Sequence, residues 1–465
     1  MKAQRFGLAC AVVAATVAIN CPVSSETLTE ALTQAYQYNP RLMAQRARLR
    51  SVDEQVPQAL SGWRPTVTAS GSAGYRHIDQ QEDDAAVDAS GDLFNRRVNA
   101  TIEQPLFRGG RTMAATRAAE NSVRAERARL WSAEQSILLS ATTAYVDVVS
   151  AAAVVELQIR NEQRLGRQLE ATRDRFRVGE VTRTDVFQSE ARLARATAER
   201  IRAEGALEAQ RAVYKNVVGV LPGAVKKPPV PSPLPPTREA AIAGALVGNP
   251  DILAAEFDER ASMDDIDFVR GELLPSVSLV GEAEREWESV REGSRFDALE
   301  ASVRMTVPLY QAGSTYSRLR AAKQTAAERR RLMDQSRRNA EEAASQGFTN
   351  VQTARAATKS LEKQVQANEV ALEGVRREAD VGARTVLDIL DAEQELVDSQ
   401  VRLVQAEREE IVASYELTSA TGSLTADKLQ LPVEHYDPEA HYREVRGLWF
   451  GGTSSGDVSS DFRKP

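Results

Sequence analysis

The chain has few aromatic residues, almost no cysteine and only three histidines. Phenylalanine, tyrosine and tryptophan make up 5% of its 465 residues, a composition typical of extended helices rather than of a thick globular core. Both cysteines, Cys10 and Cys21, stand close to the N-terminus. The remainder of the chain therefore offers neither a disulfide nor a cysteine-based metal site.

The same sequence disfavours enzymes and nucleic-acid binders. The net charge is only −7 and charges of both signs are interspersed, whereas a nucleic-acid binder carries a basic stripe. His77 lies at a strand end, His435 and His441 lie near the C-terminus, and no nucleophile–base order or phosphate-binding loop accompanies them. We predict a protein that is not an enzyme and that uses no cofactor, metal or nucleic acid.

The N-terminus has the pattern of an export signal. Lys2 and Arg5 precede a short apolar run, and small residues follow at 23–25, so we predict a signal peptide over residues 1–25. A lipoprotein acylated at Cys21 ranks second, because Asn20 stands where such signals carry a small residue. No later stretch approaches eighteen consecutive apolar residues, so the mature chain could cross a membrane only as part of a closed barrel.

The sequence is internally duplicated. Residues 27–75 align with residues 237–285, and beyond a loop the alignment continues at a constant offset, so that Pro105 matches Pro308 and Gly179 matches Gly382. We predict the following division: signal peptide 1–25, first repeat 26–221, proline-rich connector 222–236, second repeat 237–431, and a disordered tail 432–465.

Each repeat is predicted to hold two short helices, two strands and a long helical hairpin. The short helices cover 28–38 and 238–247, and further helices begin near Arg41 and Asp251. Pro57 should kink or end the first of these further helices. Alternation of apolar and polar residues predicts strands over 65–78, 94–107, 275–287 and 296–310.

Residues 111–177 and 314–380 contain no proline and predict helices of about 100 Å each. Each turns at a Val-Gly pair and returns as a helix of about thirty-five residues. Apolar residues spaced by four and three, over 137–155 and 387–415, predict that these helices pack as coiled coils.

The predicted strands require partners. Four strands cannot close a barrel, and an open sheet edge cannot face lipid. Three identical chains would supply about twelve strands, which lies within the range of outer-membrane barrels. We predict an α+β membrane protein in which four β-strands per chain contribute to a trimeric 12-stranded β-barrel, continued by a long α-helical coiled-coil barrel.

These features resemble the TolC family of outer-membrane efflux and secretion channels. The resemblance covers about residues 26–431 and is carried by the duplicated element order, by the motifs at 104–107 and 307–310, and by the turns at 175–186 and 380–391. It implies a homotrimeric exit duct of a tripartite efflux or type I secretion system in the outer membrane of a Gram-negative bacterium. Such a duct extends into the periplasm and passively conducts drugs, small molecules or polypeptides.

The implied partners are outer-membrane lipid, a periplasmic adaptor (membrane fusion) protein and an inner-membrane pump of the ABC or RND type. The alternative is a periplasmic coiled-coil scaffold or adaptor without a membrane barrel. That alternative accounts for the long helices but leaves the four duplicated strands unexplained.

The helix turns hold the candidate gate. Thr182 with Asp185, and Thr385 with Asp388, fit capping boxes, and for Asp185 capping is the favoured interpretation. The resemblance implies that Arg384 is the gating arginine, with Asp185 and Thr184 as its partners. The tyrosine that usually joins this network is replaced by Ala379.

Two acidic residues are further candidates at the gate. The resemblance implies that Asp388 and Asp391 line the aperture, where six crowded carboxylates of a trimer would have raised pKa values and attract cations. Asp391 has no acidic counterpart in the first repeat, where Gln188 stands.

The Val-Gly turns are the candidate adaptor-contacting tips. Gly179 and Gly382 supply the left-handed conformation that ends a helix. Val178 and Val381 beside them are small apolar residues suited to docking an adaptor hairpin.

Overall fold

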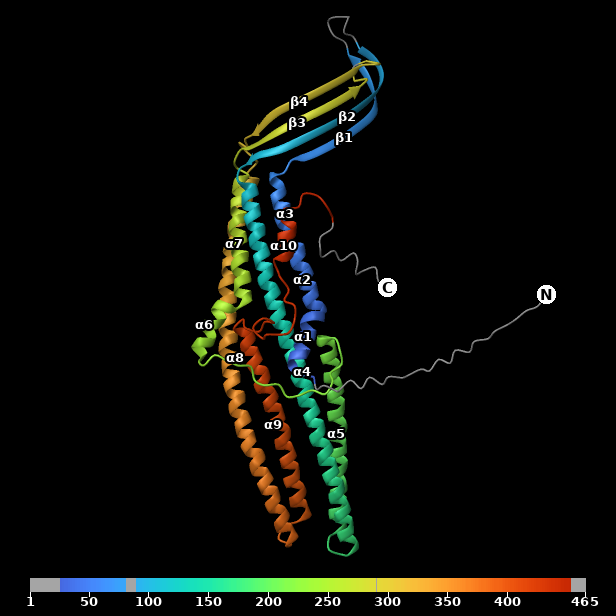
Figure 1. Cartoon of the computed structure of the whole chain (residues 1–465), viewed down its shortest axis with the longest axis vertical. Coiled ribbons are helices and arrows are strands. Elements are labelled where there is room, and N and C mark those ends of the chain that lie inside the picture. Colours follow the sequence, from blue (N-terminus) through green and yellow to red (C-terminus); the bar gives the residue numbers. More distant parts are fainter. Residues whose placement is uncertain (1–25, 81–88, 290, 453–465) are drawn as a thin grey trace, which may run out of the picture.

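The computed structural model describes residues 26–80, 89–289 and 291–452 as a long, narrow molecule with a sheet at one end and two hairpin tips at the other (Figure 1). Its helices are α1 (Leu28–Tyr38), α2 (Pro40–Asp53), α3 (Gln55–Leu60), the 3-10 turn η1 (Ser61–Trp63), α4 (Arg111–Arg177), α5 (Arg183–Val218), α6 (Arg238–Gly248), α7 (Pro250–Gly271), α8 (Ser314–Asp380), α9 (Val386–Ala420) and α10 (Ala440–Val445). Its strands are β1 (Thr66–Gln80), β2 (Ala89–Arg108), β3 (Ser276–Trp287) and β4 (Arg295–Thr306). The predicted signal peptide and Cys21 lie outside the described residues.

Local capping and proline signals set the helix boundaries, and the predicted helices are confirmed. Thr27 forms a capping box at the start of α1, and Asn39 caps α2 ahead of Pro40. The helical line breaks at Glu54 and resumes as α3, which places Pro57 in a first turn, where its missing N–H is tolerated. In the second repeat α7 runs unbroken.

The four strands form one antiparallel sheet in the order β1-β2-β3-β4. The pairing of β2 with β3 joins the two repeats, and a register shift between Pro105 and Phe107 keeps the ladder going past the proline. The predicted strand over 296–310 was too long, since β4 ends at Thr306. Pro308 has no N–H to donate, and no bulge accommodates it there.

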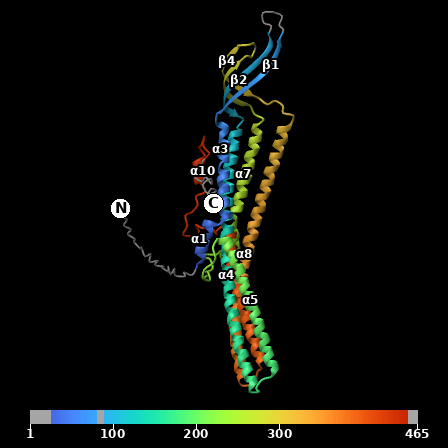
Figure 2. The same cartoon turned by 90° about the vertical axis from the view of Figure 1, so that its right-hand side faces the viewer.

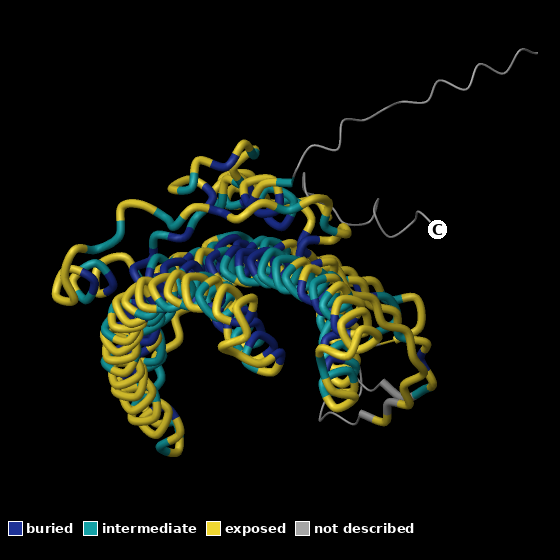
Figure 3. The backbone as a smooth tube through the Cα atoms, turned by 90° about the horizontal axis from the view of Figure 1, so that it is seen from below, coloured by how far each residue is buried: buried dark blue, intermediate teal, exposed yellow. Residues whose placement is uncertain are grey.

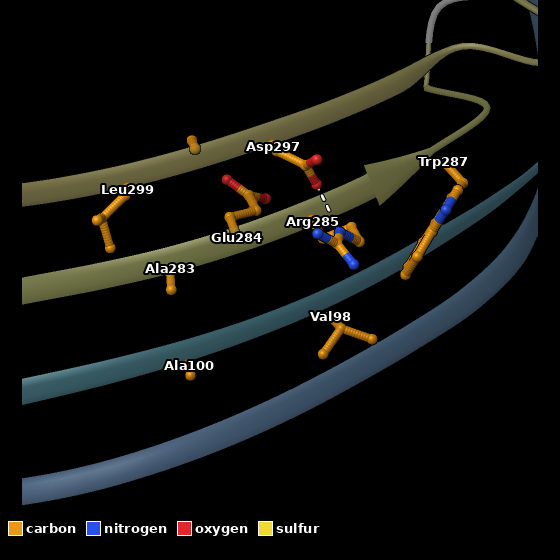
Figure 4. A pocket seen from close by; sticks show the side chains of 9 residues that line it. Val98, Ala100, Ala283, Glu284, Arg285, Trp287, Asp297 and Leu299 are labelled. Carbon is orange, nitrogen blue, oxygen red and sulfur yellow. Dashed lines mark hydrogen bonds and ion pairs between the residues drawn. The ribbon is translucent and has the colours of Figure 1, made fainter.

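The sheet has one apolar and one polar face. On the polar face Arg97 forms ion pairs with Glu284 and Glu286. Figure 4 shows a shallow hollow on the other face, lined mainly by apolar side chains of β2, β3 and β4 and closed toward the strand ends by Trp287 and the Arg285–Asp297 pair. A band of this kind fits strands that face lipid or protein, with charged and aromatic groups at the membrane boundary.

The helices form an arc. Viewed from below, they line an open curve, with the short helices and connecting loops on its convex side (Figure 3). The largest core joins α1, α4, α5 and α9, with Leu138, Tyr145 and Tyr214 almost fully buried. By composition α4 holds a window apolar enough to cross a membrane, contrary to the expectation for this part of the chain. The apolar residues of this window pack in the core described above. Their hydropathy is therefore accounted for by packing within the protein.

The prediction of a disordered tail over residues 432–465 is wrong for residues 432–452. Residues 432–452 follow the helices back toward the sheet, and α10 packs beside α2 (Figure 1). Val445 is fully buried and Tyr442 packs against the cluster around Val56 and Val123. The Gly/Ser-rich end from Gly451 favours disorder, but the stretch before it carries enough apolar groups to dock. Residues 453–465 lie outside the described residues.

Candidate gate at the helix tips

Both helical hairpins end in the same tight turn. The chain reverses at Gly179 and Gly382, which have φ angles of 84° and 79°. Backbone hydrogen bonds from Glu180 N to Arg175 O (2.9 Å) and from Ala383 N to Glu378 O (2.8 Å) close the two turns. This geometry leaves the neighbouring Val178 and Val381 side chains 73% and 81% exposed at the very end of the molecule.

Capping boxes fix the first turns of the two returning helices, as predicted. The Asp185 carboxylate accepts from Thr182 N at 2.8 Å, and the Asp388 carboxylate accepts from Thr385 N at 2.9 Å. The bond from the Thr385 backbone N–H, that from its hydroxyl, and the nearby Arg384 lower the pKa of Asp388. Asp388 is thus held ionised within one subunit, and the rise expected from crowding between subunits stays a prediction.

Arg384 is engaged on its own hairpin. Its Nε donates to Glu378 Oε2 at 2.8 Å, and this partner raises the pKa of Arg384. The implied partners Asp185 and Thr184 belong to the other hairpin, and no bond within the chain joins them to Arg384 among the described contacts. A link between Arg384 and those two residues would have to form between subunits, and it remains a prediction.

Asp391 joins the second hairpin to the first near their tips. Its carboxylate lies 2.5 Å from a guanidinium nitrogen of Arg192, which reaches it from α5. The Asp391 side chain is still 58% exposed, so it also faces the solvent at the tips. Arg192 was not predictable as this partner, because in the duplicated alignment Asp391 faces Gln188 and nothing in the sequence marks Arg192.

A small core above the tips holds the hairpins in this relation. Leu165 and Ala196 of the first hairpin meet Val386 and Leu390 of the second. This shared apolar cluster lies within a turn or two of Asp391, so the ion pair and the cluster form one contact region between the hairpins.

A buried carboxylate links α8 and α9 of the second hairpin beside that core. Glu393 is 3% exposed, and its carboxylate accepts from Arg376 at 2.5 Å. The duplicated positions Arg173 and Glu190 make the same pair in the first hairpin at 2.6 Å. The repeat could have revealed this pair, because it conserves an Arg and a Glu seventeen residues apart in both copies. Across the residues that the structure describes, no three His, Cys, Asp or Glu side chains group closely enough for a metal ion.

Comparison with known sequences gives a match over both repeats. The sequence model of the family described as "Outer membrane efflux protein" matches residues 31–219 and 241–423. The chain is 35% identical over 429 residues to the outer membrane efflux protein BepC of Brucella suis, covering 92% of each. It is 26% identical to the outer membrane protein TolC of Vibrio cholerae, covering 89% of this chain and 94% of that protein.

The fold is similar to that of solved channels. The outer membrane protein VceC of Vibrio cholerae superposes with a TM-score of 0.75 at 22% identity, covering 85% of this chain and 96% of VceC. The superposition includes far more than either repeat alone, so the arrangement of the two repeats is shared as well as the repeats themselves.

Proposed function

The chain belongs to the outer membrane efflux protein family, and from that premise we propose that it is the exit duct of a tripartite efflux or type I secretion system, gated at its periplasmic tips. The predicted family, fold class and outer-membrane location are confirmed. Members of this family are trimeric transport channels, so the chain is not an enzyme, and the alternative of a periplasmic scaffold without a barrel is wrong.

The observation that carries the proposal is the continuity of sheet and helices. Within one chain β1 pairs only with β2, and β4 pairs only with β3, so each of these strands has one unpaired edge. Both unpaired edges must pair with neighbouring subunits to close a barrel. Below the sheet, α4 and α8 each run 67 residues, about 100 Å at 1.5 Å per residue. Three such arcs (Figure 3) enclose a tunnel from the membrane to the tips.

The gate of this tunnel lies at the tips. Asp388 and Asp391 of three subunits line its mouth, and Arg384, Asp185 and Thr184 act between subunits to hold it closed. The Arg192–Asp391 pair and the core around Leu390 keep the second hairpin against the first. Opening requires this hairpin to move away, which breaks the ion pair.

The tips are also where the pump assembly docks. Val178, Gly179, Val381 and Gly382 present two exposed apolar turns per subunit, six in a trimer, to a periplasmic adaptor protein. The adaptor connects the duct to an inner-membrane pump of the ABC or RND type, and the pump selects drugs, small molecules or polypeptides as cargo. The two units of this architecture are the repeats 26–221 and 237–431, separated by the connector 222–236.

Deletion of the gene tests the proposed function. We expect a several-fold drop in the inhibitory concentration of some drugs for an efflux duct, or the loss of particular secreted proteins for a secretion duct, with recovery on complementation. Susceptibility profiling and the secreted proteome measure both. If neither changes although heat-modifiable trimers are present in the wild-type outer membrane, the proposed function is wrong.

The position of Glu26 supports cleavage of the signal peptide over lipidation of Cys21. The Glu26 carbonyl accepts from the Tyr145 hydroxyl at 2.7 Å, and Tyr145 stands about 34 residues, or about 50 Å, along α4 from the sheet. The five residues from Cys21 to Glu26 span at most about 18 Å whatever their conformation. An acyl chain on Cys21 therefore could not enter the membrane that holds the strands.

We expect cells fed radiolabelled palmitate to leave the mature protein unlabelled, and Cys21→Ser to have no effect on trimer yield in the outer membrane. Mass spectrometry should find a mature N-terminus near Ser25. An endogenous lipoprotein serves as the positive control for labelling. Palmitate in the mature chain would contradict the placement of Glu26.

A further inference from the structure

The C-terminal segment climbs from the helices to the base of the sheet. Glu439 pairs with Arg127 at 2.8 Å, and further along Arg446 pairs with Glu120 at 3.2 Å, about two turns closer to the sheet on α4. Near its end, the Arg64 guanidinium donates to the carbonyl of Leu448 at 2.7 Å. Arg64 stands two residues before the first residue of β1, Thr66, so Leu448 lies at the level where the sheet begins.

Buried contacts hold this segment in place. The His441 ring is 9% exposed, and its Nδ1 lies 3.2 Å from the Asp53 carboxylate, which is almost fully buried. Arg127 also stacks on the Tyr442 ring at 5.1 Å. Val445 is fully buried. Residues 432–452, which we call the strap, are therefore docked against the helices. Residues 448–450 consequently have a defined position.

Three large apolar side chains near the end of the described part of the strap remain exposed to solvent. Leu448 is 43%, Trp449 57% and Phe450 87% exposed, although the Arg64 guanidinium lies 5.0 Å above the Trp449 ring. Exposed apolar and aromatic residues also occupy the neighbouring strand ends: Trp63, Leu106, Phe107, Leu274, Leu309 and Tyr310. Figure 2 shows α10 on the side of the helices opposite α8, so the strap does not face the concave interior.

We propose that residues 448–450 form an interfacial membrane anchor, in which Trp449 and Phe450 insert among the headgroups of the periplasmic leaflet of the outer membrane. Aromatic side chains concentrate at this depth in membrane proteins, because the ring is apolar while the indole N–H remains near water. The Arg64 guanidinium can donate hydrogen bonds to the lipid phosphates at the same depth. The anchor extends the lipid contact of the sheet to a segment outside both repeats.

The proposal rests on the outer-membrane location of the sheet and is independent of cargo and gating. Lipid is favoured over a second subunit because the three side chains continue the exposed girdle at the strand ends, on the convex side of the arc. A neighbouring subunit approaches through the strand edges and the sides of the arc instead.

Quenching by brominated lipid tests the anchor directly. In the full-length trimer, Trp63→Phe, Trp131→Phe and Trp287→Phe leave Trp449 as the only indole. In phosphatidylcholine vesicles brominated near the headgroup end of the acyl chains, Trp449 emission should fall at least about twofold relative to unbrominated vesicles, because an interfacial indole lies within contact range of the bromines. The matched protein retains only Trp131, on α4 about 30 Å below the sheet, and should be unaffected.

Quenching of Trp449 no greater than that of Trp131 would overturn the proposal, whether the ring is in water or covered by a second subunit. If the triple substitution fails to assemble, Trp449→Cys and Trp131→Cys in a Cys21→Ser background carry an environment-sensitive fluorophore in the same vesicles. The label at 449 should then be quenched and the label at 131 should not. Equal responses would again overturn the anchor.

Discussion

Replacement of Gly109 by alanine should abolish the trimer in the outer membrane. Gly109 joins β2 to α4 with a φ angle of 62°, and a Cβ there would lie 2.3 Å from the carbonyl oxygen of Gly271 and 2.9 Å from Leu274 Cβ. The obstacle is backbone at the junction of α7 and β3, so it cannot rotate away as a side chain would. We expect a loss of about 3 kcal/mol or more per subunit, repeated three times in the trimer.

The adjacent Gly110 provides the matched control. It also has a positive φ angle, 77°, but no atom lies within 4 Å of the position of its Cβ. Gly110→Ala should therefore cost only about 1 kcal/mol of backbone strain and leave the trimer assembled. The duplicated counterpart of Gly109 is Ala312, which adopts a φ angle of 51° in the same kind of strand-to-helix turn. Left-handed backbone alone is thus tolerated at this position.

Trimer yield on unheated gels of outer-membrane fractions, together with the melting temperature of the purified trimer, measures both variants. Equal loss in Gly109→Ala and Gly110→Ala would mean that strain, rather than the close approach of Gly271, is responsible. An assembled Gly109→Ala trimer with an unchanged melting temperature would contradict the close approach of the Gly109 and Gly271 backbones.

Much of the fold was predictable because its signals are local and occur twice. The absence of proline and the spacing of apolar residues predicted α4 and α8 with the same first and last residues that the structure has. Pro57 predicted the break between α2 and α3 for the same reason, since proline acts on its own helical turn. The duplication made each weak strand signal count twice, which is why all four strands were found.

The contacts between the repeats were not predictable in the same way. The need for glycine at position 109 comes from Gly271, which is far away in the sequence, so no local pattern around Gly109 reveals it. The pairing of Arg192 with Asp391 depends on how two hairpins are rotated against each other, which the spacing within either hairpin does not determine. The docked strap was missed because it belongs to neither repeat, so no second copy supported it.

Substitution of Asp391 should weaken the block of single-channel current by a trivalent cation. Coulomb's law in bulk water gives about 2 kcal/mol for such a cation at 6 Å from one carboxylate, before screening by salt. A trimer of Asp391→Asn loses three of the carboxylates that we propose line the mouth. We therefore expect the blocking concentration to rise at least about tenfold in planar bilayers at low salt. Glu180→Gln is the matched control, since it removes an exposed tip carboxylate from the other hairpin.

Substitution of Arg192, the partner of Asp391, should change the blocking concentration in the opposite direction. Within one subunit Arg192 neutralises part of the Asp391 charge, so Arg192→Gln should leave Asp391 unpaired and lower the blocking concentration. The same change removes a tie between α5 and α9, so the open probability of the unblocked channel should rise. If Asp391→Asn leaves the block unchanged while Arg192→Gln still opens the channel, Asp391 holds the hairpins together without lining the aperture. If both variants shift the block in opposite directions, one carboxylate performs both roles, and cation binding competes with the pair that keeps the gate closed.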